Sequence, residues 1–365
     1  MGQSQVDGGL VARDRRRVHR PLGARRGRPA GRAAAEGRTR GPGPGSGSLI
    51  ATASADGPPS AGRFRSAAER PLPDGFAPLE HRCADGLVLR GLRRPGSGPA
   101  VSFLSGNGFC AGVYLSLLRR LPTDWDLFAL DAPGQGHSDD PPGYEGGRAL
   151  LERLGEALDA LIGERRRIAI GHSFGGVLST RLAGAAPERL QQLVLLDPVM
   201  FPTWMYHGIR LSARVGRHPF VNAALRRRAC WPDRAAARAY LQGRGIYRGW
   251  SDEALDDFCD HALVVDDDGV RLACPPSLEA EIFGRPLGGY WAALRRVDCP
   301  AVLFHGQDSY PILPGIARRA RSLAPRLTTQ AVPGGHCFMC EHPADTARAL
   351  SAAVNAAVAG QSAAA

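Results

Sequence analysis

The sequence predicts an α/β protein in which a mostly parallel sheet is flanked by helices. Short apolar runs recur along the chain without the alternation of a half-exposed strand, which is typical of strands buried on both faces. Between the runs lie longer segments whose apolar side chains have helical spacing, as in consecutive βαβ units. With 365 residues, 44% of them apolar, the chain can bury a sizeable core.

The regular pattern begins near residue 72. Segments 77–83 and 87–93 are expected to pair antiparallel across Ala84-Asp85-Gly86. The other expected strands are 100–104, 126–130, 167–170, 193–196, 301–304 and 327–332. The expected helices are 113–121, 148–162, 177–186, 316–323 and 343–358. This order predicts a parallel sheet with helices between its strands.

Residues 198–296 interrupt the alternation of strands and helices. This stretch contains 12 of the chain's 24 Phe, Trp and Tyr residues. We interpret it as a mainly helical insertion that covers the strand ends, with a core formed by residues 72–197 and 297–360. Most of the rings are expected to pack within the insertion, and a minority to line an apolar pocket.

The basic character of the chain belongs to its first segment. The formal net charge is +11, and residues 1–70 carry 14 Arg against five acidic residues. This segment is also rich in Gly, Ala and Pro, so it cannot bury enough apolar surface to offset chain entropy. Residues 1–71 are therefore expected to be a disordered leader. The alternative interpretation is that this leader binds nucleic acid through its arginines. We prefer the first interpretation, and no nucleic-acid partner is expected.

Ligands of parallel sheets bind beyond the carboxyl ends of the strands, so the residues that follow each apolar run are the candidates for function. One of these places holds Gly171-His172-Ser173-Phe174-Gly175. The G-x-S-x-G pattern between a strand and a helix is typical of a nucleophile elbow, a strained turn that exposes a serine hydroxyl. Other polar or glycine-rich strand ends lie at Asn107, Gly108, Asp131, Asp197, Asp308 and His336.

Four motifs together resemble the α/β-hydrolase superfamily across about residues 75–360, and in particular its cap-bearing branch of esterases and C–C hydrolases with a serine nucleophile. The motifs are the elbow, Ser105-Gly106-Asn107-Gly108-Phe109 after the first parallel strand, Asp131-Ala-Pro-Gly-Gln-Gly-His-Ser138, and Gly334-Gly335-His336. The resemblance implies an α/β-hydrolase fold with a helical cap. It also implies that the Asp131–Ser138 turn is a scaffold.

The chain order of this superfamily implies a triad of Ser173, Asp308 and His336. His336 would act as the base that accepts the serine proton and later returns it to the leaving group. The acid is the open position. Many members of the family have it three residues after the glycine, where this chain has Ser309, so Asp308 is preferred with a loop one residue shorter. Asp197 is the alternative acid.

An oxyanion formed during attack by the serine needs backbone donors. The resemblance places one donor at the N–H of Phe174, at the start of the helix after the elbow. The second donor is expected within Asn107–Phe109, with Gly108 or Phe109 preferred.

Serine at the elbow argues against epoxide opening and halide displacement, which relatives perform with an aspartate. It suits acyl transfer to water, so the sequence predicts a hydrolase of carboxylic esters of small to medium, fairly apolar substrates. The first alternative is a C–C hydrolase of vinylogous diketones, which would need a cap arginine such as Arg210, Arg214 or Arg248. The second is a non-catalytic small-ligand receptor on the same fold.

No cofactor or metal is expected. The eight cysteines have no framework spacing, and Cys337-Phe-Met-Cys340 is a single C-x-x-C without a second pair. No segment approaches the length of an apolar membrane span, so a cytoplasmic protein is expected. Its partners would be a small acyl substrate and water.

Overall fold

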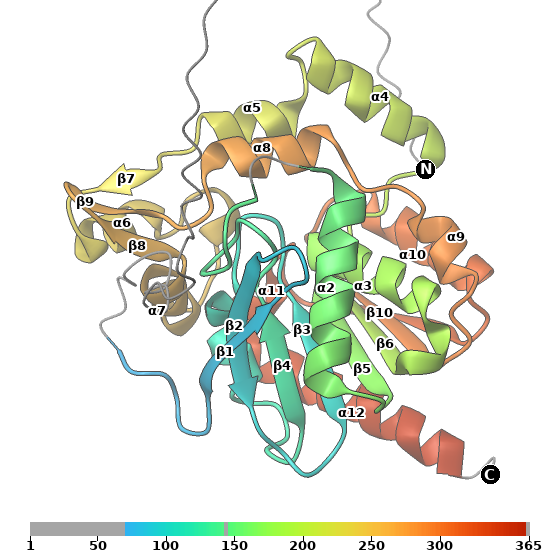
Figure 1. The fold of residues 1–365 in the computed structure, drawn as a ribbon. Helices are drawn as coiled ribbons and strands as arrows, with labels where there is room; N and C mark the ends of the chain where they lie inside the picture. Colours follow the sequence, from blue (N-terminus) through green and yellow to red (C-terminus); the bar gives the residue numbers. More distant parts are fainter. Residues whose placement is uncertain (1–69, 142–144, 363–365) are drawn as a thin grey trace, which may run out of the picture. The chain divides into compact units, whose positions relative to one another are not determined.

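An eight-stranded sheet runs through the described residues, which are 70–141 and 145–362 of this computed structural model (Figure 1). The strand order is β1-β2-β4-β3-β5-β6-β10-β11. β1 pairs antiparallel with β2 and β2 with β4, and the other neighbours are parallel. The strands are β1 (Ala77–Arg82), β2 (Val88–Arg94), β3 (Ala100–Leu104), β4 (Asp126–Leu130), β5 (Arg167–His172), β6 (Leu190–Leu196), β10 (Ala301–Gly306) and β11 (Leu327–Val332). The predicted mostly parallel sheet is confirmed.

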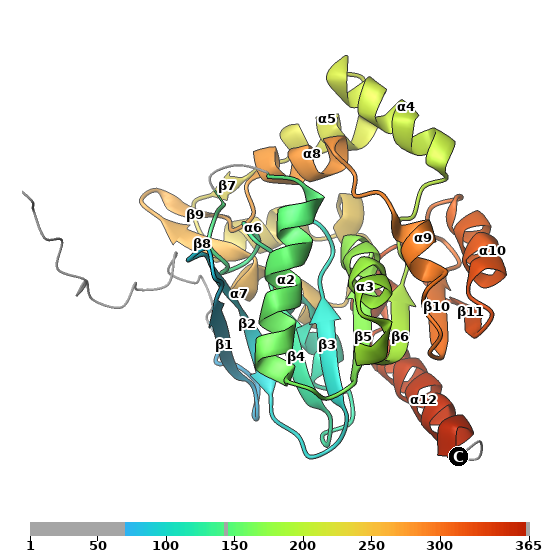
Figure 2. The ribbon, with the colours of Figure 1, turned by 45° about the vertical axis from the view of Figure 1, so that its right-hand side comes forward.

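Helices cover both faces of this sheet (Figures 1 and 2). One face packs against α2 (Gly147–Ile162), α3 (Phe174–Ala185), α9 (Tyr290–Leu294) and α10 (Leu313–Leu323). The other packs against α1 (Leu115–Leu118), α11 (Phe338–Glu341) and α12 (Pro343–Ser362). Burial on both faces explains why the strands are continuous apolar runs.

β3 illustrates this two-sided burial, since all five of its residues are buried. Val101 and Phe103 belong to the core on the α1 and α12 side, whereas Ala100 and Leu104 belong to the core on the α2 side. Successive side chains of a strand point to opposite faces, so a strand between two helical layers needs apolar residues at every position.

Between β6 and α9 the chain forms a separate group of elements. Its helices are α4 (Thr203–Arg214), α5 (Pro219–Leu225), α6 (Arg234–Leu241), α7 (Asp252–His261) and α8 (Pro276–Gly284). β7 (Cys230–Trp231), β9 (Gly269–Leu272) and β8 (Leu263–Asp266) form an additional antiparallel sheet in the order β7-β9-β8. The helices of this segment were predicted, and the small sheet was not. The limits 198–296 stay a prediction, as do the core ranges 72–197 and 297–360.

Most predicted elements agree with the structure within a few residues, and β3, β4 and β11 have the predicted bounds. The helix expected over 113–121 is wrong in its form: a 3-10 turn, η1 (Ala111–Tyr114), leads into the single turn α1. The predicted leader, residues 1–71, lies outside the described residues except for its last two.

In the part of the chain that the structure describes, no helix is both long and apolar enough to cross a membrane.

Candidate active site

Ser173 occupies the sharp turn between β5 and α3. Its backbone has φ of 51°, a left-handed conformation that non-glycine residues adopt rarely and at some cost. The turn depends on two glycines. A Cβ on Gly171 would lie 2.3 Å from the carbonyl oxygen of Gly175, and one on Gly175 would lie 2.0 Å from that of Leu104. The half-buried serine is thereby held at the carboxyl end of β5.

Three side chains from separate loops form one line of hydrogen bonds. The Ser173 hydroxyl lies 2.9 Å from Nε2 of His336, which follows β11. Nδ1 of His336 lies 2.6 Å from Oδ2 of Asp197, which follows β6. The carboxylate can only accept, so Nδ1 carries the proton and Nε2 is free to accept one from the serine.

Asp197 is the carboxylate that contacts His336, and this corrects the preferred choice of Asp308. Asp197 is fully buried, and Oδ1 accepts a hydrogen bond of 2.9 Å from the amide of Gly306. The Ser309 hydroxyl donates to Oδ2. Asp308 is exposed, and its amide donates to the carbonyl of Gly334. The position where many relatives carry the acid thus holds a serine that supports the acid of the neighbouring strand.

The order of the strands explains why Asp197, rather than Asp308, contacts His336. β6 lies between β5 and β10, so its end is next to the end of the strand that carries Ser173. Asp197 also has a positive φ, 47°, and it is the second non-glycine residue of this kind in the described part of the chain, with Ser173. Two unusual backbone conformations therefore meet at one site, a pattern typical of functional positions.

The expected oxyanion donors differ in their availability. Phe174 is the first residue of α3, and no described residue accepts a hydrogen bond from its amide. The Phe109 amide donates to the Gly106 carbonyl at 3.2 Å, so it is already used. Asn107 lines the cavity beside Ser173, and its backbone N–H has no acceptor in ranges 70–141 and 145–362, whereas its side-chain amide donates to the Glu279 carbonyl. Gly108 is absent from that cavity lining. The geometry thus favours Asn107 over Gly108 and Phe109.

A buried network that the sequence did not predict joins the loop of Gly106 to the loop of His336. The Gly106 amide donates to the Tyr114 hydroxyl at 3.0 Å, and that hydroxyl lies 2.7 Å from Nδ1 of His172. Nε2 of His172 lies 2.9 Å from the backbone carbonyl of His336. Since a carbonyl only accepts, Nε2 donates and Nδ1 accepts from Tyr114. Burial lowers the pKa of His172 well below its usual value, so the ring is neutral.

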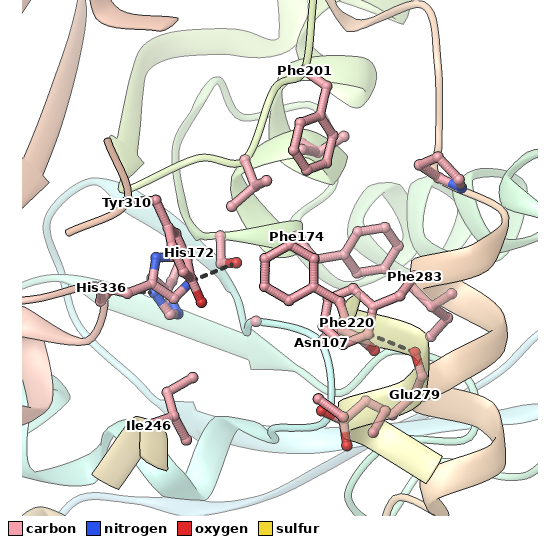
Figure 3. A pocket seen from close by; sticks show the side chains of 18 of the residues that line it. Asn107, His172, Phe174, Phe201, Phe220, Ile246, Glu279, Phe283, Tyr310 and His336 are labelled. Atoms are coloured by element: carbon pink, nitrogen blue, oxygen red, sulfur yellow. Dashed lines mark hydrogen bonds between the residues drawn. The ribbon is translucent and has the colours of Figure 1, made fainter. Parts of the chain in front are cut away.

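A cavity of about 660 Å³ opens over the serine (Figure 3). Its wall is largely apolar and comes from the strand-end loops together with α5 and α8. The rings and aliphatic chains drawn in Figure 3 include Phe174, Phe201, Phe220, Ile246, Phe283 and Tyr310. Of the aromatic rings in the inserted segment, Phe201 lines the cavity, whereas Trp250 and Phe258 pack against one another in the core.

The charged side chains that line the cavity neutralise each other. Nη1 of Arg227 lies 2.7 Å from Oε2 of Glu279, and Nη2 donates to the Tyr247 hydroxyl. Burial lowers the pKa of His218, another lining residue, so it is neutral at pH 7. Arg210, Arg214 and Arg248, the candidate anion-binding residues of the insertion, do not line the cavity. The described wall therefore has no unpaired cation for a carboxylate.

Asp131 lies in the Asp-Ala-Pro-Gly turn and has a structural place. Its carboxylate accepts hydrogen bonds from the amides of Ala111, at 2.6 Å, and His137, at 3.1 Å. Burial raises the pKa of Asp131 to about 7. Its hydrogen bonds in the described part of the chain go to neighbouring loops and not to Ser173 or His336, as expected of a scaffold.

Side chains of metal-binding types give little support for a metal. Burial raises the pKa of the Cys337 and Cys340 thiols well above the usual value, which opposes the thiolate that a metal needs. His81, Cys83 and Glu156 are close together, but the amide of Ala84 already donates to the Glu156 carboxylate at 2.8 Å. Burial also raises the pKa of Cys83, to about 11.

Comparison with known proteins agrees with this architecture. A model of the alpha/beta hydrolase family matches residues 103–349. The chain is 25% identical to 2-(acetamidomethylene)succinate hydrolase of Mesorhizobium japonicum over 280 residues, which cover 76% of this chain and 96% of that protein. It is 27% identical to a fluoroacetate dehalogenase of a Burkholderia species over 298 residues, covering 75% and 93%.

Two solved structures show the same fold. The crystal structure of E-2-(acetamidomethylene)succinate hydrolase has a TM-score of 0.64 at 22% identity and covers 77% of this chain and 99% of its own. A thioesterase domain from the curacin biosynthetic pathway has a TM-score of 0.63 at 17% identity, with 78% and 100% covered. Sheet, helical layers and these matches define an α/β-hydrolase enzyme. The chain belongs to the alpha/beta hydrolase family.

Proposed function

We propose that this enzyme is a serine hydrolase that cleaves carboxylic esters through Ser173, His336 and Asp197. The observation that carries the proposal is the unbroken line of hydrogen bonds, of 2.9 Å and 2.6 Å, through these three side chains. A serine hydroxyl is a weak nucleophile at pH 7 unless a base adjoins it. A buried carboxylate behind the ring fixes its tautomer and stabilises the imidazolium that forms.

The reaction has two stages in this proposal. Ser173 Oγ attacks the ester carbonyl while Nε2 of His336 takes its proton, and the collapse of the tetrahedral intermediate expels the alcohol, which receives that proton. Water then attacks the acyl-enzyme with the same histidine as base, and Ser173 recovers its proton as the acid leaves. The amides of Phe174 and Asn107 would donate to the oxyanion in both stages.

The cavity supports an uncharged, apolar substrate of small to medium size. Its aromatic and aliphatic wall can bury an acyl or alkyl group, and Arg227 is already paired with Glu279. The succinate part of the substrate named for the relative from Mesorhizobium carries carboxylates, which need unpaired cations. We therefore expect the two hydrolases to differ in substrate.

The C–C hydrolase alternative requires a cap arginine at the substrate, and none of the three candidate arginines lines the cavity. Dehalogenation, suggested by the relative from Burkholderia, is disfavoured by serine at the elbow. A receptor without turnover would not need a serine hydroxyl hydrogen-bonded to a histidine, as Ser173 is to His336. A cytoplasmic location and the absence of a nucleic-acid partner stay predictions.

The test combines active-site labelling with a substrate panel. A fluorophosphonate probe should label Ser173, and the purified protein should hydrolyse p-nitrophenyl esters of neutral acids. Ser173→Ala should lose both properties, while Ser179→Ala, on the same helix, should keep them. A folded protein that reacts with no probe and releases no product from esters or from a vinylogous diketone would contradict the proposal and favour the receptor.

A further inference from the structure

The outer face of α4 exposes large apolar side chains. Trp204, Leu211 and Val215 have exposed fractions of 76%, 63% and 58%. With His207 they follow a spacing of three and four residues, so they form one stripe along the helix. Figures 1 and 2 both show α4 as an outlying helix beside α5 and α8. Monomeric proteins seldom leave such a stripe uncovered.

The segment that carries this stripe has charges of one sign. Residues 198–232 contain six arginines and no Asp or Glu. Arg210 and Arg214 are exposed next to Leu211 and Val215, and Arg217 follows at the end of the helix. α4 thus combines a tryptophan, aliphatic side chains and arginines on its solvent side, the composition of a helix that lies in a membrane interface.

The stripe also borders a route to the serine. A groove of about 290 Å³ runs beside α4 and is lined by Trp204, Ile209 and neighbouring residues. Phe201, Met205 and Phe220 line both this groove and the cavity over Ser173. His218 also lines both, and the shared wall is largely apolar, so an apolar chain lying along α4 could extend toward the cavity.

We propose that this face of α4 docks the enzyme on an anionic lipid surface. Trp204 and Leu211 enter the boundary between headgroups and acyl chains, and Arg210, Arg214 and Arg217 contact the phosphates. A second copy fits less well, because a two-fold contact would bring these arginines against each other. Docking requires no catalysis, so Ser173→Ala should bind vesicles as the wild type does. A lack of vesicle binding is therefore distinguishable from a lack of ester hydrolysis.

The experiment uses the full chain with vesicles of phosphatidylcholine, with and without phosphatidylglycerol. Among the described residues, Trp204 is the one tryptophan with a strongly exposed side chain, so its fluorescence can report on contact with a vesicle. Its emission should shift to the blue with anionic vesicles, and Trp204→Phe should remove the shift. Leu211→Glu should weaken binding by at least about tenfold, and each of Arg210→Gln and Arg214→Gln by about fivefold. Val265→Glu, at an exposed valine of β8, should bind normally. The Arg-rich residues 1–70 are the same in all variants and contain no tryptophan.

Three results would overturn the proposal. Equal vesicle binding by Leu211→Glu and Val265→Glu would assign binding to another part of the chain. Concentration-dependent dimers without vesicles, lost in Leu211→Glu, would assign the face to a second copy. A Trp204 shift caused by an acidic acyl carrier protein but not by vesicles would assign it to a protein partner.

Discussion

At the scale of single residues, the proposed role of Asp197 in the activation of Ser173 is the first to test. Asp197→Asn should lower kcat by about 10⁴-fold, because the amide favours the wrong tautomer of His336. Asp308→Asn should change kcat little, since its side chain is exposed. Steady-state kinetics on a neutral ester measures both. A large loss in Asp308→Asn with an active Asp197→Asn would reverse the assignment.

We expect His172 to act as a positioning residue, so its replacement should lower kcat more than it alters KM. His172→Phe keeps a ring but loses the hydrogen bonds to Tyr114 and to the loop of His336. We expect kcat to fall by about 10- to 100-fold, since misplacement of a base or donor is costly. The kcat of Tyr114→Phe should also fall. The loss of kcat in the double variant, as a free energy, should be smaller than the sum of the two single losses.

Additive losses of kcat in the His172→Phe and Tyr114→Phe variants would contradict the idea that the two residues act through one hydrogen-bond network. Recovery of kcat in His172→Asn, which keeps a donor and an acceptor, would support hydrogen bonding over ring packing, whereas a rise in KM with constant kcat would indicate only a change in the cavity wall.

The sequence pointed to Ser173 and His336 because each stands in a short motif at a strand end, and the structure brings their side chains to 2.9 Å of each other. It preferred Asp308, whereas the structure places Asp197 against His336. Two aspartates follow neighbouring strands, and a local pattern cannot rank them. The carboxylate that meets His336 depends on the order of the strands and on Ser309, whose hydroxyl donates to Asp197. Tyr114 and His172 meet over 58 residues of sequence and gave no local signal.

At the scale of elements, we expect α8 and the segment after α5 to influence substrate choice, because Glu279 and Arg227 pair in the cavity wall. Glu279→Gln leaves the arginine unpaired, so kcat/KM for a half-ester of a dicarboxylic acid should rise by about tenfold. Activity on neutral esters should change less. Glu281→Gln, at an exposed position of the same helix, is the matched control. An unchanged preference in Glu279→Gln would show that the pair does not govern charge selection.

Long periodic elements were predictable, and short ones were not. α2 and α12 have a clear helical spacing, and β3, β4 and β11 are apolar runs with sharp ends. β7 has two residues and β8 and β9 have four each, which is too short for a pattern. The turn at 111–118 contains Gly112, where a Cβ would lie 2.3 Å from His261 of α7, so a tertiary contact shapes it.

At the scale of the whole molecule, the buried Asp131 links stability to pH. Its pKa is raised to about 7 in the folded state, against an ordinary value near 3.8, so the folded protein holds a proton that the unfolded chain releases. This contribution is complete below about pH 4 and is lost as the pH rises toward about 7. The free energy of unfolding should therefore fall over that window by more than about 1 kcal/mol relative to Asp131→Asn.

Urea denaturation of both proteins at several pH values measures this difference, with Asp268→Asn, at an exposed position, as a surface control. A difference between wild type and Asp131→Asn that is constant from pH 4 to pH 7 would contradict the raised pKa.

The order of the three site residues along the chain has a consequence for biosynthesis. In the proposed triad, Ser173 and Asp197 are synthesised before the inserted segment and His336 is synthesised after it. We therefore expect a nascent polypeptide that carries the elbow but lacks His336 to show no ester hydrolysis. Hydrolytic activity should appear only once the last strand has joined the sheet, which makes turnover a direct clock for completed folding.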